Sequence, residues 1–534
     1  MKDEFYNSIK DTFKDKADDL INSFNDMPIK AFFINTNKIN KNEIFKLIDF
    51  DYHKCSFNNN AYYYDINNIS KTKAFELGLI YPQGVESSLS FNFIEKSPKL
   101  IVDLCAAPGG KSINYINRFN DALCVSNDIN LSRLKELSKN FERLGLTNNI
   151  ITYKKPSELS NLLKGHADIV ILDVPCSGEG MVRKYKEIID DYSLKYVNSL
   201  VKIQSELLEN AYNLVSKNGY IVYSTCTYNI QEDENNITNF LNRHKDLSLV
   251  SIDIDNNFSS LNGTIKLCQL NNSEGQFVSI IKRNSENDTS KLKYLNPIRN
   301  KIVDNFISNN LSVDNYYLYK IDNRFYMSFS KLPDLGNQVL RYGIYLGDLA
   351  NNIFKPNHNM YRSNELINKF KFTYDLNDEE YNLFIKGLVI KTNLSNNYYL
   401  INYKGLSLGF SKAVNGTLKN KYPKGLRSLW YNFFMITTYN NYGEVSLRKG
   451  VFKDIVSIIV NKNSNFVGFK KDNSYISPYL ENDKLVLDIS LTAKKDIDVV
   501  KESKKLQNEI LEAITSMLNI EINNINIDIK GFNS

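Results

Sequence analysis

Two cysteines occupy matching places in the sequence, each after an apolar run typical of a buried β-strand. Cys176 follows "ADIVILDVP" and Cys226 follows "GYIVYST". Open α/β sheets bind ligands beyond the carboxyl ends of their strands, so we expect both thiols, together with Asp173, in one crevice. A lone cysteine in such a place is more often an inert core residue than a nucleophile. A pair of them beside one cofactor loop favours chemistry.

A glycine-rich stretch, "DLCAAPGGKS" (103–112), closes an earlier apolar run. Its small residues let backbone amides approach a ligand, and the helix that follows offers its N-terminus to a negative group. Asp128 ends the next strand-like run at the spacing of about 20 residues that a ribose-binding acid has in nucleotide-binding folds. The stretch matches neither G-x-G-x-x-G nor a P-loop. The pattern predicts a nucleoside cofactor, with a tight turn and a helix-capping aspartate as the structural alternative.

The cysteines also raise the question of a metal or redox site. Cys105, Cys124, Cys176 and Cys226 lie far apart in the sequence, with no C-x-x-C motif and no H-x-H pair near them. Structural zinc sites and redox dithiols usually carry such close spacings. We therefore predict no metal site, and a redox dithiol is the weaker interpretation.

The segments that must position these groups alternate between strands and helices. From about 99 to 283, "KLIVDLC", "ALCVSND", "ADIVILDVP" and "GYIVYSTC" have the pattern of buried strands. Amphipathic helices separate them, such as those expected at 131–146 and 195–215. Buried strands alternating with amphipathic helices indicate a parallel sheet of βαβ units, hence an α/β fold.

The rest of the chain differs in pattern. Residues 1–95 are typical of short helices followed by a mixed stretch, and 286–428 of irregular α+β structure. In 429–534, "KLVLDISL" alternates as a half-buried strand, a helix follows at 499–518, and "INIDI" returns as a strand. We therefore expect four domains, 1–95, 96–285, 286–428 and 429–534, the last a small βαβ module without an obvious catalytic residue.

The bulk composition is that of an ordinary globular protein. The chain has 534 residues, of which 42% are hydrophobic and 24% charged, and a net charge of +6. That charge permits an RNA partner without demanding one. The N-terminus lacks the apolar segment of a signal peptide, and no apolar run approaches the ~18 residues of a membrane helix. Six cysteines without close pairing fit reduced thiols, so we expect a soluble cytoplasmic protein with no membrane partner.

The motifs together resemble those of a known enzyme family. "DLCAAPGGKS", "DVPCSGEGMVRK" and "YSTCTYNIQEDE" are similar to the motifs of the NOL/NOP/Sun family of S-adenosylmethionine (SAM)-dependent RNA cytosine-C5 methyltransferases. The sequence is most similar to the bacterial 16S ribosomal RNA branch (RsmF/YebU type), and the similarity covers roughly 1–428. The resemblance implies a Rossmann-like methyltransferase domain, an N-terminal RNA-binding extension and a C-terminal PUA-like RNA-binding region.

The resemblance also implies a role for each candidate site residue. Cys226 would attack carbon 6 of the cytosine, and Cys176 would assist release of the adduct. Asp173 would hydrogen-bond nitrogen 3 of the base and border the cofactor, while Lys111 would point into the same crevice. Asp128 would hold the ribose of SAM. The methionine part of SAM would lie against Cys105, Ala106, Ala107, Pro108, Gly109, Gly110 and Lys111.

The sequence departs from the family pattern at two points. Phe33 stands where an arginine is usual, and "QEDE" (231–234) replaces the usual E-E-N-E after the second cysteine. Basic residues in 181–186 and 418–427 are candidate phosphate contacts, with a merely solvated surface as the alternative. The residue that meets the adenine stays unassigned. Ribosomal RNA, within the small subunit, is the implied substrate; transfer RNA, or a catalytically idle role in ribosome assembly, are the alternatives.

The tail of the chain, residues 435–534, resembles the small bacterial alkaline-shock-protein family. That family carries no catalytic motif, so the resemblance implies binding to an unknown protein partner. The only tryptophan, Trp430, lies just before this tail, and Met435 follows it closely. One hypothesis is that Trp430 is a UGA codon and two adjacent genes have been read as one chain. A natural fusion is the alternative.

Overall fold

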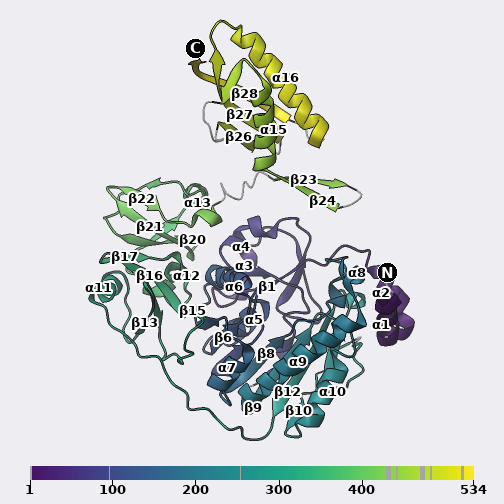
Figure 1. Cartoon of the computed structure of the whole chain (residues 1–534). Helices are drawn as coiled ribbons and strands as arrows, with labels where there is room; N and C mark the ends of the chain where they lie inside the picture. The colour runs from purple at the N-terminus through teal and green to yellow at the C-terminus, as the bar shows by residue number, and fades with distance from the viewer. Residues whose placement is uncertain are drawn as a thin grey trace. The chain divides into compact units, whose positions relative to one another are not determined.

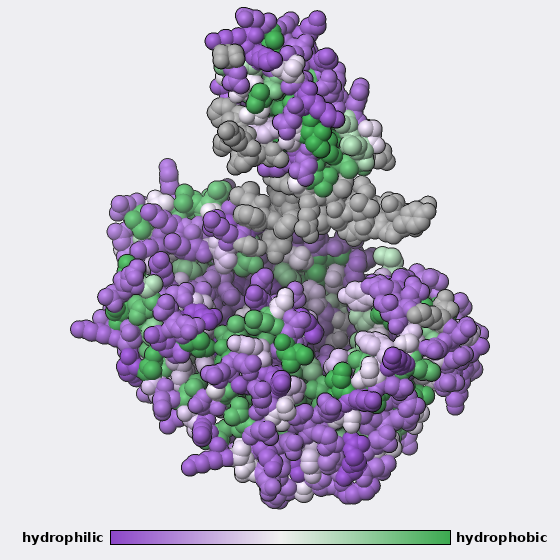
Figure 2. All heavy atoms as spheres, in the orientation of Figure 1, coloured by the Kyte–Doolittle hydropathy of each residue, from purple (hydrophilic) through white to green (hydrophobic). Residues whose placement is uncertain are grey.

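The computed structural model describes residues 3–95, 97–252, 254–255, 257–427, 435–440, 443–468, 475–481, 484–518 and 522–533. They form two compact units, Met1–Asp378 with Lys391–Lys421, and Glu379–Ile390 with Tyr422–Ser534. Each unit has its own hydrophobic core. Hydrophilic residues dominate the coloured surface in Figure 2, and no helix among the described residues is long and apolar enough to cross a bilayer.

The first unit begins with two short helices and a small antiparallel sheet. The helices are α1 (Asp3–Phe13) and α2 (Ala17–Ser23). The sheet has the order β2-β3-β1-β4, made of β1 (Ala31–Ile34), β2 (Tyr52–Lys54), β3 (Ala61–Tyr64) and β4 (Ile80–Pro82). In α1, Phe5, Ile9 and Phe13 recur at helical spacing and are buried. The short helices were predicted, and the sheet was not.

The central sheet of the described residues has nine strands, in the order β10-β12-β9-β8-β5-β6-β7-β15, with β11 paired to β12. Its parallel strands are β5 (Leu100–Asp103), β6 (Leu123–Asn127), β7 (Asn149–Thr152), β8 (Ala167–Asp173) and β9 (Val215–Thr225). The antiparallel strands are β10 (Leu247–Leu249), β11 (Thr264–Leu267), β12 (Gln276–Arg283) and β15 (Val339–Tyr342). This topology confirms the predicted Rossmann-like α/β class and adds β7, which the sequence analysis missed.

Helices cover both faces of this sheet (Figure 1). They are α5 (Gly110–Arg118) and α6 (Leu131–Leu144) on one face, and α7 (Pro156–Leu162), α9 (Leu194–Leu214) and α10 (Glu234–Arg243) on the other. Successive residues of β5 serve the two faces, because Ile101 packs in the core with α5 and Val102 in the core with α9. The helices predicted at 131–146 and 195–215 are confirmed as α6 and α9.

The chain beyond β12 adds further strands and short helices to the first unit. Its β15 extends the central sheet by antiparallel pairing with β7, where Arg341 lies opposite Ile151. A second sheet has the order β13-β14-β16-β17, made of β13 (Tyr317–Ile321), β14 (Arg324–Ser328), β16 (Ile344–Ala350) and β17 (Ile353–Pro356). The other elements are α11 (Lys301–Asn310), α12 (His358–Arg362), β18 (Thr373–Leu376), β20 (Tyr398–Tyr403), β21 (Leu406–Val414) and β22 (Thr417–Asn420).

The second unit contains the predicted βαβ module. Its elements are β27 (Lys484–Lys494), α16 (Val499–Leu518) and β28 (Ile522–Asn533), and β27 runs parallel to β28. Leu506, Ile510 and Ile514 form the buried face of α16. The unit also has β23 (Met435–Asn440), β24 (Gly443–Arg448), α15 (Lys449–Lys462), β25 (Phe466–Gly468) and β26 (Ile476–Glu481). Trp430, the predicted junction, lies outside the described residues.

Candidate active site

A cavity of about 950 Å³ lies at the carboxyl ends of β5, β6, β8 and β9. This is the edge at which open α/β sheets bind ligands. The predicted site residues that line it are Cys105, Ala106, Ala107, Pro108, Gly110, Lys111, Asp128, Asp173, Cys176 and Cys226. Gly109 is not among the lining residues and serves the turn instead. Its φ of 115° lies in the left-handed region, and an added Cβ would meet Ile113 and Leu137 at 3.4 Å.

The two thiols meet in this cavity. The Sγ atoms of Cys176 and Cys226 lie 3.1 Å apart, and the backbone N–H of Cys226 donates a hydrogen bond of 3.3 Å to the Cys176 sulfur. The hydrogen bond with Cys226 and burial both raise the pKa of Cys176 well above its usual value. Cys176 is therefore held as a neutral thiol at physiological pH.

The backbone around Cys226 is fixed by contacts with the loop that carries Cys176. The Gly180 N–H donates to the Cys226 carbonyl at 3.0 Å, and the hydroxyls of Ser177 and Thr227 share a hydrogen bond of 2.7 Å. Gly180 also packs directly on Gly275, because a Cβ added at Gly180 would lie 2.5 Å from the Gly275 Cα. The two cysteine loops therefore form one interlocked structure.

Asp173 and Lys111 form an ion pair beside the thiols. The Lys111 Nζ lies 2.7 Å from Asp173 Oδ1, and the Ser224 hydroxyl donates to the same oxygen at 3.0 Å. The Lys111 side chain is only 6% exposed, whereas that of Asp173 is 42% exposed. A buried ammonium group thus holds a carboxylate that can still reach a ligand in the cavity.

The other end of the cavity is organised around Asp128. This buried carboxylate accepts hydrogen bonds from the N–H groups of Ala107 (3.3 Å) and Asn130 (2.8 Å), and it pairs with Arg133 at 3.3 Å. It therefore ties the glycine-rich turn to the tip of β6. Ile129, the next residue, lines the cavity with 73% of its side chain exposed. Sequence reasoning did not single out Ile129.

The residues of this end fit SAM. Gln83 Oε1 is buried and has no hydrogen-bond partner among the described residues, and Gln83 lines the cavity next to Gly110. An acceptor left without a donor suits a ligand with N–H or O–H groups, as the amino acid and ribose parts of SAM have. The apolar side chain of Ile129 beside Asp128 suits an adenine ring next to its ribose. Neither feature requires a metal.

A buried carboxylate, Glu232, supports the Cys176 loop from behind. It accepts hydrogen bonds from the Ser177 N–H at 3.1 Å and from Gln204 Nε2 at 2.7 Å. The same amide nitrogen of Gln204 also donates to the Pro175 carbonyl at 2.9 Å. Burial raises the pKa of Glu232 to about 7, although these hydrogen bonds oppose the shift. The "QEDE" segment is thus part of the site's frame and not a surface acidic patch.

Several sequence candidates have other roles in the structure. Phe33 is buried in β1 and packs edge-on against Phe91, with ring centroids 6.0 Å apart. Arg183 donates to the Ser23 carbonyl at 3.0 Å, and Lys186 binds the Phe24 carbonyl, so both hold the C-terminal end of α2. In 181–186, Met181, Lys184 and Tyr185 line the cavity, and no described residue of 418–427 does. Lys184 is therefore the better placed phosphate contact.

Three family models match the chain. The model for 16S rRNA methyltransferase RsmB/F matches residues 94–282. The model for the N-terminal domain of 16S rRNA methyltransferase RsmF matches residues 1–85, and that for the methyltransferase RsmF PUA domain matches residues 371–428. The matches thus stop short of the βαβ module in the second unit.

Two curated relatives match over most of their length. The ribosomal RNA small subunit methyltransferase F of Psychromonas ingrahamii is 27% identical over 387 residues, which cover 65% of this chain and 79% of the relative. The protein of the same name from Shewanella piezotolerans is 25% identical over 470 residues, covering 79% and 96%. Among solved structures, that of PH0851 is 26% identical with a TM-score of 0.50, covering 52% of this chain and 65% of that one. The chain is therefore a SAM-dependent RNA methyltransferase whose residues 94–282 match the RsmB/F family and whose residues 1–85 and 371–428 match the N-terminal and PUA domains of the RsmF type.

Proposed function

We propose that the chain methylates carbon 5 of a cytosine in the RNA of the small ribosomal subunit, through a covalent adduct at Cys226. The observation that carries this proposal is the pair of thiols 3.1 Å apart at the floor of a cofactor-sized cavity. Carbon 5 of cytosine is a poor nucleophile until a thiolate adds at carbon 6. A second thiol at the same point has no purpose in simple RNA binding.

Cys226 attacks carbon 6 of the cytosine, and Cys176 assists release of the adduct. A bond forms between the Cys226 Sγ and carbon 6, and the displaced electron pair makes carbon 5 nucleophilic. When bound, SAM supplies the electrophilic methyl group. The hydrogen at carbon 5 then passes as a proton to water, and the electron pair of that C–H bond re-forms the double bond between carbons 5 and 6 and expels the Cys226 sulfur as a thiolate. Because its pKa is raised, Cys176 keeps its proton until release. It lies close enough to the Cys226 sulfur to donate that proton as the sulfur departs.

Asp173 binds the base while this happens. Addition at carbon 6 raises the electron density at nitrogen 3, so this nitrogen takes up the proton that the Cys226 thiol loses and donates a hydrogen bond to the Asp173 carboxylate, which stabilises the adduct. The ion pair with Lys111 and the bond from Ser224 both engage Asp173 Oδ1, so the carboxyl group has a fixed orientation in the cavity. Lys111 thereby positions Asp173 and adds positive charge near the reacting ring.

The cofactor lies at the Asp128 end of the cavity in this proposal. The turn from Cys105 to Lys111 holds the methionine part, and Asp128 borders the ribose. Ile129 packs on the adenine, which supplies the contact that the sequence left unassigned. Gln83 offers its unpartnered oxygen to a donor of the same ligand.

The RNA approaches from the thiol side. The target base must leave its stack to reach Cys226, because a base inside a helix cannot enter a cavity of this kind. Lys184 and Tyr185 line the cavity, are exposed, and suit a phosphate and a base, respectively. The relatives are named for ribosomal RNA of the small subunit, which favours that substrate over transfer RNA. A cytoplasmic location follows from such a substrate.

Two cysteine variants test the proposal. Cys226→Ala should abolish methyl transfer from labelled SAM to small-subunit RNA taken from a strain that lacks the gene. Cys176→Ala should leave a protein–RNA adduct that survives a denaturing gel. Cys55→Ala is the matched control, because Cys55 is a buried thiol outside the cavity. Full activity of Cys226→Ala would refute the mechanism, and labelling of transfer RNA alone would refute the substrate.

For the tail, we propose an interaction module of the alkaline-shock-protein type that binds a protein partner. Residues 435–534 lie beyond the three family matches and include a βαβ unit with its own core. Whether the tail is a natural fusion is decided by the codon for Trp430. A UGG codon and a full-length band on a blot of the native protein would exclude the read-through hypothesis.

A further inference from the structure

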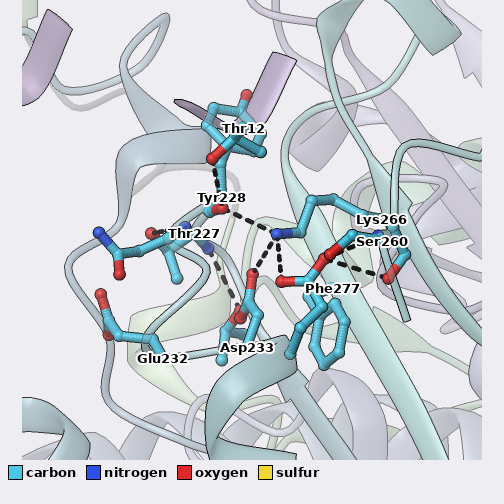
Figure 3. A network of polar contacts seen from close by, with 12 residues as sticks. Thr12, Thr227, Tyr228, Glu232, Asp233, Ser260, Lys266 and Phe277 are labelled. Carbon is cyan, nitrogen blue, oxygen red and sulfur yellow. Dashed lines mark hydrogen bonds and ion pairs between the residues drawn. The ribbon is translucent and has the colours of Figure 1, made fainter. Parts of the chain in front are cut away.

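A lysine ammonium group is fully buried behind the catalytic loop. Lys266 lies in β11, and its side chain is 0% exposed, as is that of Asp233, while that of Glu234 is 5% exposed. The Lys266 Nζ lies 3.2 Å from Asp233 Oδ2 and donates to Glu234 Oε2 at 2.7 Å. It also donates to the Tyr228 carbonyl at 2.8 Å. Figure 3 shows the Lys266 ammonium group pointing at Asp233 and at the Tyr228 carbonyl.

These contacts reach both sides of Cys226. On the N-terminal side, Asp233 Oδ1 accepts a hydrogen bond of 2.6 Å from the hydroxyl of Thr225, the residue directly before the nucleophile. That hydroxyl in turn accepts the Thr227 N–H at 3.4 Å. On the C-terminal side, Lys266 holds the Tyr228 carbonyl directly. Lys266 and Asp233 thus bracket the loop from Thr225 to Tyr228.

The N-terminal helix binds the same loop. The Thr12 hydroxyl donates to the Tyr228 carbonyl at 3.3 Å, so this carbonyl accepts from both Thr12 and Lys266. The Phe13 ring packs edge-on against the Tyr228 ring, with centroids 5.1 Å apart. Earlier in α1, the Ser8 hydroxyl donates to Glu179 at 3.0 Å. The loop is therefore held between α1 and β11.

Stability alone does not account for a buried lysine at this place. Burying charges costs free energy, and apolar residues of the same volume are often as stable or more so. Burial raises the pKa of Asp233, and the nearby Lys266 opposes that shift and favours the carboxylate. The ion pairs instead fix positions. They hold the Asp233 carboxylate and the Lys266 ammonium group in place on the two sides of the Cys226 loop. Reaction rates are sensitive to such placement, because a misplacement of about 1 Å can cost about a hundredfold.

We propose that Lys266, acting through Asp233 and the Tyr228 carbonyl, is a positioning residue that holds the Cys226 thiol in its reactive place against Cys176. This rests on the proposed function only in that Cys226 is the nucleophile. Lys266 itself touches neither RNA nor cofactor, since it is fully buried and does not line the cavity. Its removal should therefore impair the step at Cys226 and leave substrate binding intact.

Three variants test the contacts that run from Lys266 through Asp233 to the Thr225 hydroxyl. Lys266→Met removes the charge while keeping the length of the side chain. Thr225→Val removes only the hydroxyl that binds Asp233, and Thr225→Ser keeps it. Lys282→Met, on the neighbouring strand β12, is the matched control, because Lys282 is half-buried and does not line the cavity. Circular dichroism establishes that each variant is folded, and if Lys266→Met is not, the Thr225 pair decides.

The first readout is kinetic. Lys266→Met and Thr225→Val should lower kcat at least about tenfold and leave KM for RNA and SAM within about twofold, as expected for misplaced reacting groups. Thr225→Ser and Lys282→Met should stay near wild type. The second readout does not need methyl transfer: diamide should form the disulfide between Cys176 and Cys226 at least about tenfold more slowly in the first two variants.

The outcomes separate this proposal from the proposed function. Folded Lys266→Met and Thr225→Val proteins with wild-type kcat and wild-type oxidation rate would overturn the positioning role, even if the enzyme methylates RNA as proposed. Slowed oxidation in a protein that methylates no RNA would refute the function and uphold the positioning role. A rise in KM alone would also overturn the positioning role, since it would place Lys266 in substrate binding.

Discussion

The sulfur atoms of Cys176 and Cys226 lie 3.1 Å apart, although 50 residues separate them in the chain. A disulfide needs its sulfurs at about 2.05 Å, so a shift of about 1 Å would join them. This short distance lets both sulfurs act at carbon 6 of the base. It also makes the two thiols susceptible to oxidation to a disulfide.

We expect diamide to inactivate the enzyme by forming this disulfide. The two thiols would lose two protons and two electrons to the N=N bond of the reagent, which becomes a hydrazine. Dithiothreitol should restore activity, and mass spectrometry of the unreduced protein should show a linked pair of peptides. Cys55→Ala should remain sensitive to diamide, whereas Cys176→Ala should form no such link. A protein that is inactivated without the linked peptides would contradict this expectation.

Replacing Asp173 should impair the chemical step. Asp173→Asn keeps the shape of the side chain but removes the charge that pairs with Lys111 at 2.7 Å. Loss of one group that stabilises charge in a transition state typically costs about 10²–10³ in kcat, and we expect a loss of that size in single-turnover methyl transfer. In the Cys176→Ala background, Asp173→Asn should also reduce the amount of trapped adduct.

Ser224→Ala is the matched control for that experiment. It removes the 3.0 Å hydrogen bond to Asp173 Oδ1 and a 3.4 Å one to the Leu172 carbonyl but leaves the ion pair in place, so its effect should be less than about tenfold. Asp173→Asn activity close to wild type would show that the carboxylate does not contact the reacting base.

Glu232 should make the protein less stable as the pH rises. Its pKa is about 7 in the folded chain, above the value of about 4.3 in an unfolded chain, so the folded state binds more protons between these values. The free energy of unfolding therefore falls as the pH rises through this window, and the full loss is present above pH 7. This loss of unfolding free energy is on the order of 4 kcal/mol.

Glu232→Gln should therefore raise the thermal midpoint at pH 8 and leave it close to wild type near pH 4.5. Glu187→Gln, at an exposed carboxylate, should change neither value. An equal effect of Glu232→Gln at both pH values would point to packing instead of titration. Because Glu232 holds the Ser177 N–H, activity of this variant should be measured alongside its stability.

Removing the tail should leave methyl transfer unchanged. Every residue that lines the cavity lies between Tyr81 and Gln276, and 435–534 have a separate core. A chain that ends at residue 434 should keep kcat and KM within about twofold, because it keeps every residue that lines the cavity and loses only residues with a separate hydrophobic core. A loss of more than about tenfold would show that the tail takes part in the reaction.

Much of the site could be predicted because its strands are long, buried and β-branched. The apolar runs that form β5, β6, β8 and β9 each end in a reactive or ligand-binding side chain or in a turn. Because these strands are parallel, their carboxyl ends lie at one edge of the sheet. β7 was missed because "NIIT" is only four residues long in an asparagine-rich context. The strands of the N-terminal sheet are equally short, and their pairing partners are distant in the sequence.

The supporting residues could not be predicted, for a different reason. A lysine such as Lys266 in a strand normally indicates a solvated edge, and nothing local reveals that Asp233 and Glu234 will meet it. Ile129 carries no motif, and its exposure beside Asp128 is evident only once the sheet edge exists. Reactive residues can be recognised from local sequence patterns, whereas the residues that position them are identified only by their tertiary contacts.

The contact of Thr12 with the Tyr228 carbonyl joins residues 216 positions apart. On a ribosome, α1 leaves the exit tunnel long before the loop that it binds, and Lys266 follows later still. Chains fold from the N-terminus as they are made, at about 5–20 residues per second. The nucleophile therefore reaches its final geometry only after β11 has emerged, and a nascent chain shorter than this should hold SAM-loop structure without a working thiol.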